Sequence, residues 1–262
     1  MTLYRMALRQ IFVSWLVWAI VIVLGVATVV SAAPAVAHSD VLAGLVQRLP
    51  SLVRGLLGGP LLLKRPVDGY LYVKLVMYLP LLVGIFTGFQ ASSLLARDRD
   101  HRRLDFLLSL PVTRRRLLLV RLGALVTAQA AMWAVVILAL CGFMHQEGLQ
   151  VDTAGYVLVG YSGFLVTLAT GSIALWASAG ARDYGAALRW GLGAAAVPFV
   201  YDLSVRIATT AHGWLYILPY GYYDPPQLLL THAFPWLATA VLVVASGLLT
   251  YAAVHTFEQR EV

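Results

Sequence analysis

The chain has 262 residues, of which 60% are hydrophobic and only 12% are charged, and its mean hydropathy is +0.80. A soluble domain carries about 25% charged residues, so this composition excludes a soluble globular protein. It indicates a polytopic membrane protein. The net charge of +7 then predicts basic loops that face anionic lipid or a partner protein, and no nucleic-acid binding.

Six apolar runs are long enough to cross the hydrocarbon core as helices, which takes about 20 residues. They cover residues 10–37, 70–96, 117–144, 153–180, 184–209 and 233–257, and predict an all-α integral membrane protein with one transmembrane domain over 1–262. Arg5 and Arg9 before the first run, and Ala35-Val36-Ala37 at its end, resemble a signal peptide. The run is longer than the usual signal core of about 7–15 residues, so we expect an uncleaved span.

Basic residues in the loops set the expected orientation. If the N-terminus is cytoplasmic, the inner segments hold eleven basic residues and the outer segments hold four. The positive-inside rule therefore favours six spans with both termini in the cytoplasm. Apolar residues recur at helical spacing in the first outer loop, residues 38–69, and predict an interfacial amphipathic helix bent at Pro50. A loop packed on the helix ends is the alternative there, and a second interfacial helix is expected in the fifth loop, before the last span.

The connection between the second and third spans, residues 97–116, gathers ten of the 31 charged residues of the chain. Residues 97–110 predict a short cytoplasmic helix, whose apolar edge consists of Leu104, Leu107, Leu108 and Pro111. Pro111 ends this helix because proline cannot continue the hydrogen-bonding pattern, and Thr113 suits the N-cap of the next span. Three arginines then oppose the helix dipole, so they predict contacts with lipid phosphate or an acidic partner: Arg114, Arg115 and Arg116.

Two segments resemble ABC-2 type transporter permeases. The stretch LDFLLSLPVTRRR, residues 104–116, is similar to the family signature LxxLLxxPVSRxxLL between the second and third spans. The stretch LPYGYYDP, residues 218–225, resembles the aromatic segment ending in Asp-Pro that the family often has in its last outer loop. Six spans with both ends inside also fit this family, so the resemblance extends over the whole chain.

The resemblance implies that residues 97–116 include a coupling helix that docks in a groove of a separate ATP-binding subunit. It assigns the docking contact to Arg102, Arg103, Leu104, Asp105, Phe106, Leu107, Leu108 and Pro111. It further implies two copies of the ATP-binding subunit, which hold ATP and Mg, a second permease copy or homologue, and export across a bacterial-type plasma (inner) membrane. The chain itself has no GxxxxGK[ST] pattern, so we expect a transport subunit without its own ATPase site or cofactor.

Ionisable residues inside the predicted spans are few. Asp202 and Arg206 are spaced for an i, i+4 pair near the outer surface, either snorkelling at the interface or forming an outer gate with Tyr222 and Tyr223. Ion-driven carriers generally need a carboxylate or a broken polar helix at mid-depth, so the spans favour a hydrophobic or amphipathic cargo. Six glycines of the fourth and fifth spans are expected to let neighbouring helices approach closely: Gly155, Gly160, Gly163, Gly171, Gly191 and Gly193.

Two other functions stay open at this stage. An integral membrane enzyme acting on lipid substrates would need a polar set at the interface, such as His212, Asp224 and His232. A stand-alone secondary carrier would work without an ATPase partner. The six histidines show no metal-ligand spacing, and we expect His145, Glu147 and Asp152 to form a solvated cluster in an outer loop.

Overall fold

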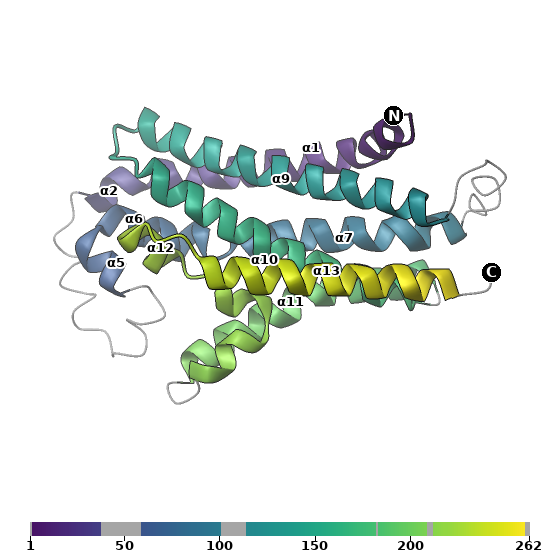
Figure 1. Ribbon diagram of the computed structural model, residues 1–262. Helices are drawn as coiled ribbons and strands as arrows, with labels where there is room; N and C mark the ends of the chain where they lie inside the picture. Colours follow the sequence, from purple (N-terminus) through teal and green to yellow (C-terminus); the bar gives the residue numbers. More distant parts are fainter. Residues whose placement is uncertain (1, 38–58, 101–113, 182, 209–211, 260–262) are drawn as a thin grey trace.

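The computed structural model describes residues 2–37, 59–100, 114–181, 183–208 and 212–259, and every element in these ranges is helical. Figure 1 shows a bundle of long helices with short helices gathered at one end. The long helices are α1 (Thr2–Ser31), α7 (Leu79–Asp100), α9 (Arg114–Gln146), α10 (Thr153–Ala179), α11 (Tyr184–Ile207) and α13 (Trp236–Gln259). The short ones are α2 (Ala33–Ala37), α5 (Gly59–Lys64), α6 (Pro66–Leu71), the π-helix η1 (Tyr72–Val76), the 3-10 helices η2 (His212–Ile217) and η3 (Pro219–Tyr222), and α12 (Pro225–Thr231).

Five segments of the described chain are helices long and apolar enough to cross a membrane. They are Leu3–Ala35, Pro66–Ser93, Leu118–Gln146, Thr153–Ala179 and Trp236–Thr256. Helix α11 has the length of a span, but it carries Arg189, Asp202 and Arg206 and does not belong to this set. The chain therefore has the features of a multi-pass membrane protein, while a sixth span and the orientation in the membrane stay predictions.

The outward faces of α1 and α13 are apolar, as lipid contact requires. Val13 and Val17 on α1, and Leu237 and Leu248 on α13, are exposed large side chains with no polar stripe beside them. In a soluble protein such a surface would be costly, because each exposed aliphatic side chain forgoes about 1.5–3 kcal/mol of burial. Hydrocarbon tails are the natural covering for this belt.

Helix α10 occupies the centre of the bundle and contacts α7, α9, α11, α12 and α13. Small residues on α10 make room for larger neighbours: a Cβ on Gly160 would meet Ile137, one on Gly163 would meet Trp133, and one on Gly171 would meet Thr87. The predicted packing role of these glycines is therefore confirmed. It is also confirmed for Gly191, which lies against Gly88 of α7, but not for Gly193, which has open space beside it.

Both described termini lie at the same end of the bundle, at the right of Figure 1, where α7 also ends and α9 begins. We call this the terminal end, and the opposite end, which holds α2, α5, α6 and α12, the far end. Two boundaries differ from the prediction. Helix α1 begins at Thr2 and not near residue 10, and α7 runs unbroken to Asp100, so the predicted short helix does not begin separately at Arg97.

Candidate functional site

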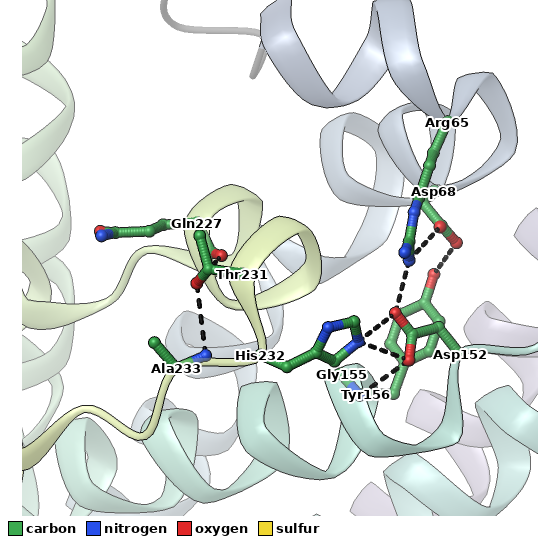
Figure 2. A network of polar contacts seen from close by, with 9 residues as sticks. All are labelled: Arg65, Asp68, Asp152, Gly155, Tyr156, Gln227, Thr231, His232 and Ala233. Atoms are coloured by element: carbon green, nitrogen blue, oxygen red, sulfur yellow. Dashed lines mark hydrogen bonds and ion pairs between the residues drawn. The ribbon is translucent and has the colours of Figure 1, made fainter.

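A polar joint at the far end ties together three connections of the bundle (Figure 2). Its centre is Asp152, which begins α10 and accepts a hydrogen bond from the Gly155 amide at 3.0 Å. Arg65, between α5 and α6, donates its Nη1–H to Asp152 Oδ2. The His232 ring, after α12, places Nε2 2.9 Å from Oδ1 and 2.8 Å from Oδ2 of the same carboxylate. We call Arg65, Asp152 and His232 the far-end joint.

A buried hydrogen bond between Tyr156 and Asp68 lies next to the far-end joint. The Tyr156 hydroxyl donates to Asp68 Oδ1 at 2.7 Å, and both residues are buried. Arg65 also lies 3.7 Å from Asp68 Oδ2, so one guanidinium is shared between two carboxylates. These contacts fix α6 against the start of α10, one turn into the bundle.

The contacts within the far-end joint stabilise the ionised forms of Asp152 and Arg65. Burial opposes ionisation of Asp152, but hydrogen bonds from His232, Arg65 and the Gly155 amide outweigh it and hold the pKa of Asp152 below its usual value. The hydrogen bond to Asp152 correspondingly raises the pKa of Arg65. The predicted solvated cluster of His145, Glu147 and Asp152 is therefore wrong for Asp152, whose partners come from two distant connections.

His232 adopts a backbone conformation that is unusual for its residue type. Its φ of 53° lies in the left-handed region, at the position that closes the C-terminus of α12 and that glycine usually occupies. A histidine at this position is strained where glycine would not be. We attribute its presence to the hydrogen bonds that its ring makes with Asp152. Of the other residues predicted for an enzyme site, Asp224 accepts from the Gln227 amide and caps α12, and the enzyme interpretation stays a prediction.

The predicted pair of Asp202 and Arg206 is present on α11. Arg206 Nε donates to Asp202 Oδ2 at 2.7 Å, and Arg206 Nη2 donates to the Tyr223 carbonyl at 3.1 Å. Asp202 is only 7% exposed, so the pair is built into the protein at the end of α11, and whether Arg206 reaches the membrane interface stays a prediction. The Tyr223 hydroxyl in turn donates to the Val76 carbonyl, and the Tyr222 ring packs 5.4 Å from that of Tyr216. A gating role for these residues stays a prediction.

A polar contact near the middle of α9 and α10 joins these two helices. Gln129 Nε2 and Trp133 Nε1 both donate to Thr167 Oγ1, and Gln129 also donates to the Phe164 carbonyl at 3.2 Å. Thr167 then returns its hydroxyl hydrogen to its own helix. These hydrogen bonds join α9 to α10, so they form a packing contact between the two helices.

The residues predicted to dock a partner, 102–111, lie outside the described residues. Arg114, Arg115 and Arg116 do stand in the first turn of α9, as predicted, and Arg116 is exposed at the terminal end. Within the described residues, no group of three His, Cys, Asp or Glu side chains lies close enough to hold a metal ion.

Sequence reasoning missed most of the far-end joint. Asp152 carried one usable signal, because an aspartate directly before a long apolar run is a typical N-cap. Nothing in the sequence connects it to Arg65, 87 residues away, or to His232, 80 residues away. No family model matches the chain, and no curated protein or solved structure shows significant similarity to it.

Proposed function

We propose that the chain is the membrane-spanning subunit of an ATP-driven transporter of the ABC-2 type, and that a separate ATP-binding subunit docks on residues 97–116. The observation that carries the proposal is the placement of charge. The long apolar helices bring the end of α7 and the start of α9, with its three arginines, to the same end as both described termini. If the signature-like segment 104–116 also lies at this end, the basic residues of the loop would face one side of the membrane.

The bundle interior supports a mechanical role. Gln129, Trp133 and Thr167 hydrogen-bond across α9 and α10 inside the bundle, and the pair of Asp202 and Arg206 lies near the end of α11. A carrier driven by an ion gradient would use exchangeable polar groups at mid-depth. Energy delivered by a docked subunit needs only stiff helices that transmit motion. A hydrophobic or amphipathic cargo, moved outward, fits the apolar interior best.

Co-purification tests the proposal. We expect a tagged full-length chain, extracted from its native membrane in mild detergent, to bring down an ATP-binding subunit and to show ATPase activity. The variant Leu107→Asp/Leu108→Asp should abolish both the co-purification and the activity, because two carboxylates replace the apolar edge of the docking segment. Its membrane insertion should be unchanged.

The matched control is Ser109→Asp/Thr113→Asp, which adds the same charge to the same segment at polar positions, and keeps a capping side chain before α9. This control should retain the ATPase partner. If the chain purifies alone and still moves cargo, or if both double variants behave alike, the proposed docking role is wrong.

A further inference from the structure

A cavity of about 590 Å³ lies beside the far-end joint, between α5 and α6 on one side and the connection from α9 to α10 on the other. This volume falls within the range of about 300–1,000 Å³ that small-molecule sites occupy. Its charged lining comes from Lys64, Arg65, Asp68, Glu147 and Asp152. The cavity is therefore large enough for a ligand and carries charge of both signs.

Three of the five charged residues are already engaged. Arg65 and Asp152 bond to each other, and Asp68 accepts from Tyr156. The side chains of Lys64, at the end of α5, and Glu147, at the start of the α9–α10 connection, are exposed, and neither has a hydrogen-bond or ion-pair partner among the described residues. The cavity thus presents one ammonium and one carboxylate, from separate segments, for a ligand to neutralise.

A ligand that matches these two groups must be dipolar. A simple anion would leave Glu147 unmatched, and a simple cation would leave Lys64 unmatched. A metal ion does not fit either, since no three candidate ligand side chains of the described residues converge. An anionic group at Lys64 and a primary ammonium at Glu147 satisfy both, because an ammonium donates three hydrogen bonds and a carboxylate accepts them.

The rest of the lining indicates where such a ligand comes from. The cavity also has an apolar wall, formed by Pro34, Pro66, Val67, Leu149 and Val151. Pro34 lies next to Ala35, the last residue of the first apolar segment long enough to span a membrane, and Pro66 begins the second, so the cavity lies at the ends of these helices. A polar headgroup with attached acyl chains has this combination of a charged tip and an apolar body.

We propose that this cavity binds a phosphoethanolamine group, with the phosphate at Lys64 and the ammonium at Glu147, as the headgroup of a zwitterionic phospholipid. The proposal concerns binding alone and does not depend on an ATP-driven mechanism. A soluble phosphoethanolamine compound carries the same charges, so the experiment separates the two sources.

The test titrates purified full-length chain in detergent with short-chain phosphatidylethanolamine, phosphatidylcholine and phosphatidylglycerol by calorimetry. Phosphatidylethanolamine should bind about threefold or more tightly than the other two, since choline has no N–H donor and glycerol has no positive charge. Glu147→Gln should remove the preference for ethanolamine over choline. Lys64→Gln should weaken the binding of the ethanolamine and choline lipids by a similar factor of about 3–10, because both lipids contain the phosphate.

Two variants control for loss of a charge elsewhere. Lys74→Gln removes an exposed lysine outside the cavity, and Glu258→Gln removes a carboxylate near the end of α13. Both should bind as the wild type does. Binding of glycerophosphoethanolamine as tightly as of the lipid would assign the site to a soluble compound, and much weaker binding would assign it to the membrane. Equal binding of ethanolamine and choline lipids by the wild type, or an unchanged preference in Glu147→Gln, would overturn the proposal.

Discussion

The His232 ring lies within 2.9 Å of both carboxylate oxygens of Asp152, although 80 residues separate them along the chain. The contact joins the connection before α13 to the start of α10, so it ties the last long helix to the central one. His232 occupies a left-handed backbone position with a φ of 53°. Backbone and ring therefore make opposite contributions to stability at this residue.

Substitutions at His232 should separate those two contributions. Glycine relieves the backbone strain and removes the ring, whereas alanine removes the ring and keeps the strain, so His232→Ala should be less stable than His232→Gly by about 1 kcal/mol. A double-mutant cycle of His232→Gly with Asp152→Asn should give a coupling of about 0.5–1 kcal/mol, since His232 is partly exposed. Unfolding in detergent measures both values. Additive single substitutions would show that the ring contact contributes nothing.

The Asp152 carboxylate should make stability depend on pH in the acid range. Its pKa in the folded state lies below the usual value of 3.8, so the unfolded chain takes up the proton first. The stabilisation is therefore fully present above about pH 4 and is lost as the pH falls through the lower folded-state pKa. The difference in unfolding midpoint between the wild type and Asp152→Asn should shrink between pH 5 and pH 3. A difference that grows on acidification would have the wrong sign.

The sequence predicted the long helices well, because an uncharged run of span length has few alternatives. The last span was expected at 233–257 and α13 covers Trp236–Gln259, with Pro235 just before it. Boundaries next to charged residues were less certain. Helix α7 continues through Arg97 to Asp100, because charged residues do not stop a helix as proline does.

The far-end joint was beyond sequence reasoning for a physical reason. A single aspartate before an apolar run indicates a cap, and Asp152 is one, but a cap does not specify which distant side chains will reach it. The close approach of Gly88 to Gly191 could be predicted only in part. The sequence indicated close packing at Gly191, but it did not identify Gly88 as the partner. Pairings between helices depend on the relative rotation of whole elements, which no short segment encodes.

The crossing of α7 and α11 should be sensitive to one methyl group. A Cβ on Gly191 would overlap the Gly88 backbone and the Ser92 hydroxyl, so Gly191→Ala should destabilise the protein by about 1–3 kcal/mol. Gly193→Ala is the matched control two residues along, because a Cβ there meets nothing within 4 Å. It should be neutral or stabilising, since alanine favours helices. Equal unfolding midpoints for the two variants would contradict this packing.

The buried hydrogen bond from Tyr156 to Asp68 should contribute more to the free energy of unfolding than an exposed hydrogen bond does. Tyr156→Phe removes a donor at 2.7 Å and leaves a buried carboxylate oxygen without it, at a cost of about 1–3 kcal/mol. Tyr251→Phe provides the comparison, because Tyr251 is 69% exposed on α13. Its unfolding midpoint should match that of the wild type. The double variant Asp68→Asn/Tyr156→Phe should recover part of the stability lost in Tyr156→Phe, because a neutral amide is cheaper to bury than a carboxylate that has lost its donor.

Arg206 should be the most sensitive charged residue of α11. Its guanidinium bonds at once to Asp202 and to the Tyr223 carbonyl, which lysine cannot do with the same geometry. Arg206→Gln leaves the Asp202 carboxylate buried without its counter-ion, so we expect a loss of about 3–5 kcal/mol in the free energy of unfolding. Arg206→Lys should fall between this variant and the wild type.

Two further variants distinguish loss of the pair from loss of a positive charge. Arg189→Gln removes an exposed arginine of the same helix and should leave the unfolding midpoint unchanged. Asp202→Asn/Arg206→Gln should recover part of the stability lost in Arg206→Gln, because a neutral amide is cheaper to bury than an unpaired carboxylate. If the double variant is less stable than Arg206→Gln, the penalty comes from the lost bond to the Tyr223 carbonyl and from packing, and the buried-charge explanation is wrong.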